Sequence, residues 1–188
     1  MQYCEFKQKL QGRVFGDDLN YEILRTVLLN PKRYIGLFRI TNAKTKLIQN
    51  LTQSCEIKFG DFLEEIFTQY IVEMGYQNLN KNIGLDEESN PLSADQVFMK
   101  DNQVYLIEQK VRDDHDSTKK RGQYLNFIKK IRALKNQYPN QKIIAGMWFT
   151  DSSLAKNKRY YQESIDTNTD DLLELHLWYG QEIFSDFF

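Results

Sequence analysis

Three charged residues near the middle of the chain have types and a spacing that suit chemistry at a phosphate group. Asp95 lies in the apolar segment 92–98, and Glu108 and Lys110 end the apolar segment 104–110. Side chains two residues apart on a strand point to the same face, so Glu108 and Lys110 are expected together. Charges beside an apolar core need partners, and a divalent cation held by Asp95 and Glu108 would provide one.

Hydrolysis of a phosphodiester bond is the reaction that such a group could perform. Mg²⁺ prefers a few carboxylate oxygens and retained waters, and it can activate water and neutralise a phosphate. The main-chain carbonyl of Gln109 could supply a further ligand. Lys110 could position the attacking water, help to deprotonate it or stabilise developing charge, and these roles stay open. The plainer alternative is a solvent-facing Asp95 and a surface ion pair between Glu108 and Lys110.

Two strands and the helix before them would position these residues. Segments 92–98 and 103–111 indicate adjacent strands, and the Asp101-Asn102 pair between them favours an antiparallel hairpin. An apolar stripe at helical spacing predicts a helix over 59–74, with Gly75 as its C-terminal stop. The chemical residues are therefore expected at the ends of strands in a sheet that a helix precedes.

The remaining elements predict an α/β (α+β) fold with a central mixed β-sheet flanked by helices and a helical N-terminal segment. The 188 residues suit a single domain, 1–188, with a helical layer at 1–57 and a core at 58–188. In the layer, a helix over 21–29 ends before Pro31, and one or two short helices follow around 37–51. The core continues with a helix over 118–137, a strand over 142–150, a partly helical 153–165, a strand over 172–179 and a terminal helix or tail. Trp148, Phe149 and Trp178 are expected as packing aromatics.

Asp95 followed by Glu108-Gln109-Lys110 at the end of an apolar strand resembles the PD-(D/E)xK nuclease superfamily. The run 108–123 more narrowly resembles bacterial Type II restriction endonucleases, and the resemblance covers roughly 59–149. It implies a restriction-endonuclease-like sheet flanked by helices and bound Mg²⁺. It also implies cutting of both strands of double-stranded DNA at a short recognition sequence. Such enzymes are commonly homodimers and leave 5′-phosphate ends.

By this resemblance Asp95 and Glu108 are metal ligands and Lys110 is the catalytic lysine. Many members also carry a glutamate on the helix before the hairpin, which makes Glu64 the candidate here and Glu65 the fallback. Ala94 stands where the motif has proline, at a position that varies in the superfamily. The end of the chain at Phe188 suits either a compact member or a catalytic portion of a longer protein.

Basic residues at the start of helix 118–137 are the candidate DNA contacts. Lys119, Lys120 and Arg121 oppose the helix macrodipole, which favours a phosphate at this end of the helix. Gln123 and Asn126 are candidate base readers on the same helix. Segment 108–135 has nine Lys and Arg against four Asp and Glu. A solvated helix face is the plain alternative to this interpretation.

Composition and local sequence patterns argue against several other classes of protein. A net charge of −1 gives no support to indiscriminate coating of nucleic acid. No apolar run reaches the roughly 18 residues of a membrane span, and the N-terminus lacks a signal-peptide pattern. Cys4 and Cys55 have no CxxC spacing, so we expect a cytoplasmic protein without a zinc site or a membrane partner. A structure-specific repair or recombination nuclease, or a non-catalytic nucleic-acid-binding module, are the competing hypotheses.

Overall fold

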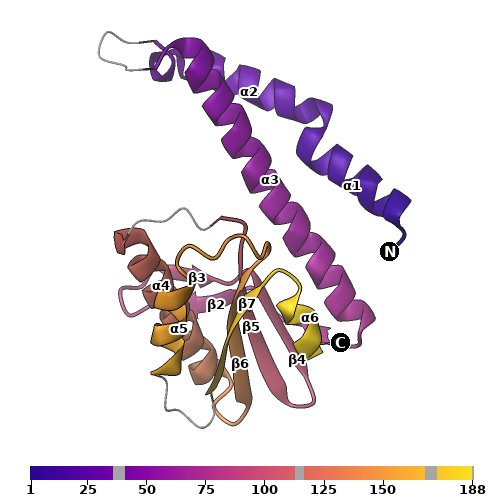
Figure 1. The fold of residues 1–188 in the computed structure, drawn as a ribbon, viewed down its shortest axis with the longest axis vertical. Helices are drawn as coiled ribbons and strands as arrows, with labels where there is room; N and C mark the ends of the chain where they lie inside the picture. Colours follow the sequence, from indigo (N-terminus) through magenta and orange to yellow (C-terminus); the bar gives the residue numbers. More distant parts are fainter. Residues whose placement is uncertain (36–40, 113–116, 168–172, 188) are drawn as a thin grey trace. The chain divides into compact units, whose positions relative to one another are not determined.

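The computed structural model describes residues 1–35, 41–112, 117–167 and 173–187 and divides into two compact units, Met1–Glu65 and Ile66–Phe188. The boundary falls within one long helix, α3 (Figure 1). No described helix has the length and apolar character that crossing a membrane requires. Each unit is considered by itself below.

The N-terminal unit is built from helices. It contains α1 (Tyr3–Phe15), α2 (Asp17–Leu29), the 3-10 helix η1 (Pro31–Arg33) and most of α3 (Ala43–Glu73). The predicted stop before Pro31 is confirmed, since α2 ends at Leu29. The expectation of separate short helices before a helix over 59–74 was wrong, because α3 runs unbroken for 31 residues. Asn42 caps its start by accepting a hydrogen bond from Thr45 N–H at 2.8 Å, and no proline interrupts it.

The second unit holds the expected mixed sheet. Five strands lie in the order β1-β4-β5-β6-β7, with β4 antiparallel to β5 and with β5, β6 and β7 parallel. Their bounds are Gln77–Asn78 for β1, Gln96–Lys100 for β4, Gln103–Lys110 for β5, Lys142–Phe149 for β6 and Leu173–Tyr179 for β7. A separate two-stranded sheet pairs β2 (Asn82–Leu85) with β3 (Pro91–Ser93).

The predicted hairpin is confirmed, although the strand before it is divided. Asp101 and Asn102 both have positive φ, at 50° and 60°, as the tight turn between β4 and β5 requires. The single strand expected over 92–98 is instead two strands in different sheets, β3 and β4, with Asp95 between them. The chain changes sheets here because Ala94 N–H donates to the Lys81 carbonyl at 2.9 Å, outside the main sheet.

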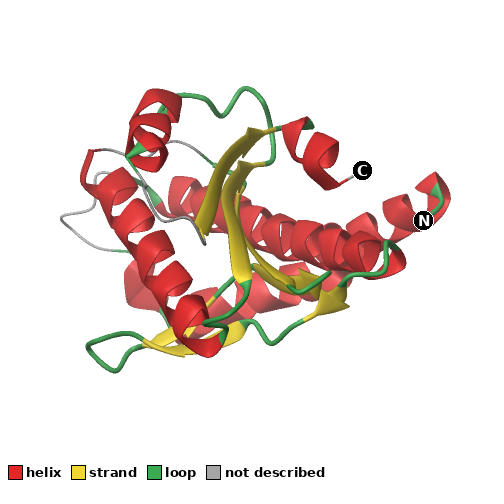
Figure 2. Ribbon diagram, turned by 90° about the horizontal axis from the view of Figure 1, so that it is seen from below, coloured by secondary structure: helices red, strands yellow, loops and turns green. Residues whose placement is uncertain are grey.

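Helices cover both faces of the main sheet (Figure 2). On one face, α4 (Ser117–Gln137) and α5 (Lys158–Asp166) pack onto the sheet through Phe127, Ile131 and Tyr161. On the other face, the end of α3 and the short α6 (Glu182–Phe187) contribute Phe67, Ile71 and Ile183. The packing role predicted for three aromatics is confirmed, since all are buried: Trp148, Phe149 and Trp178.

A glycine in β6 allows the aromatic residues to pack on the sheet face that α3 and α6 cover. A Cβ at Gly146 would lie 2.0 Å from the Trp178 ring, far inside van der Waals contact. The ring has little freedom to move away, because its Nε1 donates to Asp186 Oδ2 at 2.6 Å and its face stacks on His176. Close approach of the indole ring therefore requires glycine at this position.

Gly146→Ala should lower the free energy of unfolding by about 1–3 kcal/mol, because the added methyl group overpacks the core. Gly122→Ala is the matched control: its Cβ would meet nothing within 4 Å, and in α4 it should raise stability by roughly 0.5–1 kcal/mol. Urea unfolding of both variants and the parent checks the pair. Equal stability of the Gly146 variant and the parent would contradict the packing argument.

Candidate active site

The end of β5 places Glu108 and Lys110 on the sheet face that α4 covers. Residues alternate along the strand, and Leu106 on the same face belongs to the core beneath α4. The neighbouring strand holds this end of β5 in place, because the main-chain N–H and the hydroxyl of Thr150 both donate to the Lys110 carbonyl, at 3.0 and 3.3 Å. The predicted shared face of Glu108 and Lys110 therefore follows from regular strand geometry.

Asp95 lies beside Glu108 and Lys110 because its side chain takes the place of a main-chain acceptor that β4 does not provide. β4 begins at Gln96, opposite Ile107, so β4 offers no main-chain acceptor to the amide of Gln109 further along β5. Asp95 Oδ2 accepts this N–H at 2.7 Å. The carboxylate is thus held at the edge of β5, in the position that a strand carbonyl would otherwise take.

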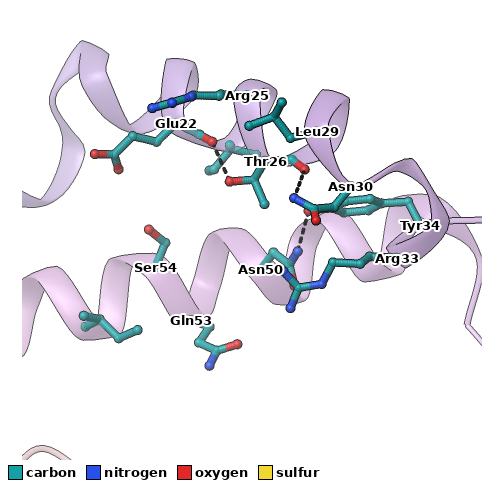
Figure 3. A pocket seen from close by; sticks show the side chains of 12 residues that line it. Glu22, Arg25, Thr26, Leu29, Asn30, Arg33, Tyr34, Asn50, Gln53 and Ser54 are labelled. Atoms are coloured by element: carbon teal, nitrogen blue, oxygen red, sulfur yellow. Dashed lines mark hydrogen bonds between the residues drawn. The ribbon is translucent and has the colours of Figure 1, made fainter.

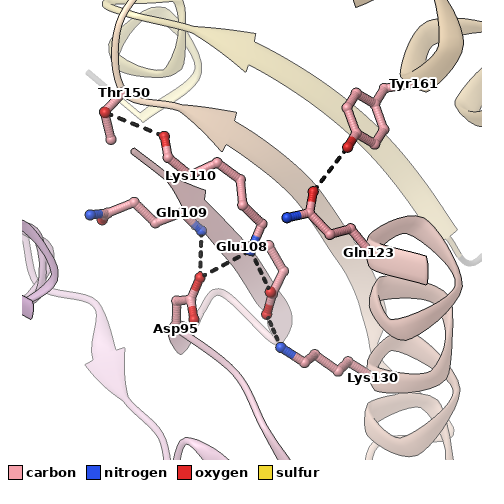
Figure 4. Close-up of polar contacts among 8 residues, drawn as sticks. All are labelled: Asp95, Glu108, Gln109, Lys110, Gln123, Lys130, Thr150 and Tyr161. Carbon is pink, nitrogen blue, oxygen red and sulfur yellow. Dashed lines mark hydrogen bonds and ion pairs between the residues drawn. The ribbon is translucent and has the colours of Figure 1, made fainter. Parts of the chain in front are cut away.

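The three predicted side chains converge on one charge, as Figure 4 shows. Lys110 Nζ lies 3.1 Å from Glu108 Oε2 and 3.7 Å from Asp95 Oδ2. Glu108 is almost fully buried, with 5% of its side chain exposed, whereas 24% of Asp95 and 19% of Lys110 remain accessible. Glu108 and Lys110 therefore do not form an exposed surface ion pair, which was the plainer alternative.

Lys130 of α4 is a fourth member of this centre and was not among the predicted site residues. Its Nζ lies 2.6 Å from Glu108 Oε1, and only 7% of its side chain is exposed. A signal was available, because Lys130 follows Phe127 by three residues and precedes Leu134 by four, which places it on the apolar stripe of the helix. A lysine on a buried stripe needs an acidic partner, and Glu108 is that partner.

Burial and mutual charge shift the titration of this centre. Burial raises the pKa of the Asp95 carboxyl and the Glu108 charge raises it further, against the opposing effects of Lys110, Lys130 and the Gln109 N–H. Burial alone would lower the pKa of Lys110, but the carboxylates of Glu108 and Asp95 outweigh burial and raise that pKa above its ordinary value. Lys110 is therefore a positive charge at neutral pH.

Two carboxylates and one main-chain carbonyl of this centre are the candidate ligands for a metal ion. Among the described residues, no group of three or more His, Cys, Asp and Glu is arranged to hold a metal. Mg²⁺ needs only one or two carboxylates with retained waters, and Asp95 and Glu108 both lie close to one cationic nitrogen. The N–H and C=O of a strand residue point to the same side, so the Gln109 carbonyl is directed toward the side where Asp95 lies.

The residues expected to contact DNA from α4 have different surroundings. Lys120 Nζ lies 4.8 Å above the Tyr160 ring, and Gln123 accepts a hydrogen bond from the Tyr161 hydroxyl at 2.9 Å. One end of the Gln123 amide is thus engaged inside the fold. Three further candidates are exposed on the helix: Lys119, Arg121 and Asn126. Their contacts with DNA stay predictions, as does the role of Glu64, which belongs to the N-terminal unit.

Comparison with known protein families gives a match that covers most of the sequence. A family model described as Type II restriction endonuclease, HinfI, matches residues 5–86 and 73–188. No curated protein and no solved structure was found to match the chain. The two matched segments overlap and together take in both structural units. The chain therefore belongs to the HinfI family of Type II restriction endonucleases.

Proposed function

We propose that this chain is a magnesium-dependent endonuclease that cuts both strands of DNA at a specific sequence and leaves 5′-phosphate ends. The observation that carries the proposal is the convergence of Asp95, Glu108 and Lys110 at the end of β5, in a chain of the HinfI restriction endonuclease family. Two carboxylates beside a protonated lysine form a centre suited to a metal ion and a scissile phosphate.

Each side chain has a distinct task in this proposal. Asp95 and Glu108, with the Gln109 carbonyl, would hold Mg²⁺, which supplies an activated water and neutralises the phosphate. The two acidic neighbours raise the pKa of Lys110 in the metal-free protein, so we assign it the role of a positive charge that would stabilise the pentacoordinate phosphorus of the transition state. Lys130 does not need to touch DNA: its bond to Glu108 Oε1 fixes the orientation of that carboxylate.

The proposed activity also implies a homodimer on DNA. Within the described residues the catalytic group forms once in each chain, whereas cutting of both strands requires attack at two phosphates. A second copy related by twofold symmetry would supply the second centre and would match a palindromic or nearly palindromic site.

The first test uses plasmid DNA with Mg²⁺, followed by sequencing of the fragment ends. We expect fragments with one common end sequence, and no cutting when EDTA replaces Mg²⁺. Asp95→Asn, Glu108→Gln and Lys110→Ala should each lower the cleavage rate by roughly 100-fold or more, because each removes a charge that the transition state needs. Glu87→Gln, at an exposed side chain, and Lys142→Ala, at a surface pair, are the matched controls.

Circular dichroism should show that these variants fold, and the Lys110 variant should still bind DNA in Ca²⁺. Retained cutting by any two of the three site variants would overturn the site assignment. Cleavage confined to branched, nicked or mismatched DNA would favour a structure-specific repair nuclease instead. Binding without any cleavage, with or without Mg²⁺, would point to a non-catalytic module.

Asp95→Asn should make the metal-free protein more stable at neutral pH. The pKa of Asp95 is higher in the folded protein than its ordinary value of 3.8, so the ionised carboxylate favours the unfolded state. This penalty is absent below the unfolded pKa and grows as pH rises through the folded pKa. The asparagine keeps an acceptor for Gln109 N–H without the charge, so its stability advantage should shrink as pH falls.

The measurement for this prediction is urea unfolding in EDTA from mild acid to neutral pH. Addition of Mg²⁺ should then stabilise the parent more than the variant, because the parent keeps both ligands. A variant less stable than the parent throughout the pH range in EDTA would show that the ion pair with Lys110 outweighs burial at Asp95.

Lys130→Met should lower both stability and cleavage, although Lys130 is not a catalytic residue. Loss of a buried, charged hydrogen bond to Glu108 should cost about 1.5–3 kcal/mol in unfolding free energy. If Lys130 orients Glu108 for the metal, the variant should need more Mg²⁺ for half-maximal cleavage. Lys130→Arg, which keeps the charge, should recover part of the Mg²⁺ dependence. An unchanged Mg²⁺ requirement in a folded methionine variant would limit Lys130 to a structural role.

A further inference from the structure

Positive charge is segregated into one part of the N-terminal unit. Segment 23–55 has six Lys and Arg and no Asp or Glu, in a chain whose net charge is −1. Its described helical parts are the second half of α2, η1 and the first part of α3. Such an uninterrupted basic segment is an electrostatic footprint for a polyanion, even though the whole chain is slightly acidic.

A cavity of about 480 Å³ lies between α2 and α3 and is lined mostly by residues of this segment (Figure 3). Two arginines, Arg25 and Arg33, stand at it, and neither forms an ion pair with any described residue. The sole carboxylate among the residues that line the cavity is Glu22, which Lys58 neutralises at 2.8 Å. The residues that line the cavity therefore include two arginines and no unpaired carboxylate.

Hydrogen-bond donors complete the cavity. Tyr34 is buried, with only 6% exposed, and its hydroxyl accepts a hydrogen bond from Asn50 Nδ2 at 2.6 Å. The O–H of Tyr34 then remains to donate to another acceptor. Gln53 and Ser54 add neutral amide and hydroxyl groups to the wall. Guanidinium, hydroxyl and amide donors in one cavity form a set that suits phosphate oxygens.

We propose that this cavity binds the phosphodiester backbone of DNA. The inference rests on the proposed function and adds a second DNA contact, in the helical unit. Arginine gives two parallel hydrogen bonds to a phosphate, and the neutral donors give binding without sequence selectivity. The site should therefore strengthen binding to every duplex alike, while base-specific contacts lie elsewhere.

The test compares two double variants in the full chain, bound to fluorescent duplexes in Ca²⁺ across a range of salt concentrations. Arg25→Gln with Arg33→Gln removes the two cavity arginines. Lys7→Gln with Arg13→Gln removes the same charge from α1 of the same unit, where both residues are exposed. The cavity pair should weaken binding and reduce the slope of log K against log salt by about 1–2, since each phosphate contact contributes about 0.9. The α1 pair should change the slope by less.

Two further comparisons separate the possible failures. Arg25→Lys with Arg33→Lys keeps both charges and should restore most of the slope, which excludes misfolding as the cause of the loss. The effect should also be equal for a cleaved duplex and an unrelated one. A parent that binds no duplex would overturn the proposed function itself. A parent that binds and cuts DNA, with a cavity variant of unchanged slope or a control with an equal loss, would overturn this inference alone.

Discussion

A buried carboxylate held by two lysines is the constraint around which the C-terminal unit is organised. Glu108 receives Lys110 at one oxygen and Lys130 at the other, and it is almost completely removed from solvent. Ionised groups at such a depth are tolerated only when partners and hydrogen bonds replace water. The partners come from two elements, β5 itself and α4, so the ion network also fixes how this helix lies on the sheet.

Under the proposed function, the charges of this centre favour entry of the metal and DNA together. Asp95 and Glu108 carry two negative charges, and Lys110 and Lys130 carry two positive charges. A divalent cation added to this balanced group would leave an excess of positive charge in a region of low dielectric constant. A phosphodiester beside the cation would offset one of the two added positive charges. We infer that metal affinity is lower in the free protein than in the complex with DNA.

The sequence predicted the parts of this centre that follow from regular periodicity. Strand alternation placed Glu108 and Lys110 on one face, and the two-residue turn placed β4 beside β5. The local surroundings of Asp95 were not predictable in the same way, because a side chain there replaces a main-chain acceptor and ends the strand. Lys130 was missed because the stripe on α4 was defined by apolar residues alone, although a paired lysine fits that stripe equally well.

A local excess of positive charge in the sequence was a poor predictor of an exposed basic surface, and the structure gives the reason. The basic excess of segment 108–135 suggested a DNA surface, yet several of its cations have partners inside the fold. Lys110 and Lys130 bind Glu108, Lys129 binds Asp86 at 2.9 Å, and Lys120 lies over Tyr160. Segment 23–55 has an excess of six positive charges and contains no Asp or Glu. Pairing inside the fold, and not only the number of charges, therefore decides how much of a local excess is left for a polyanion.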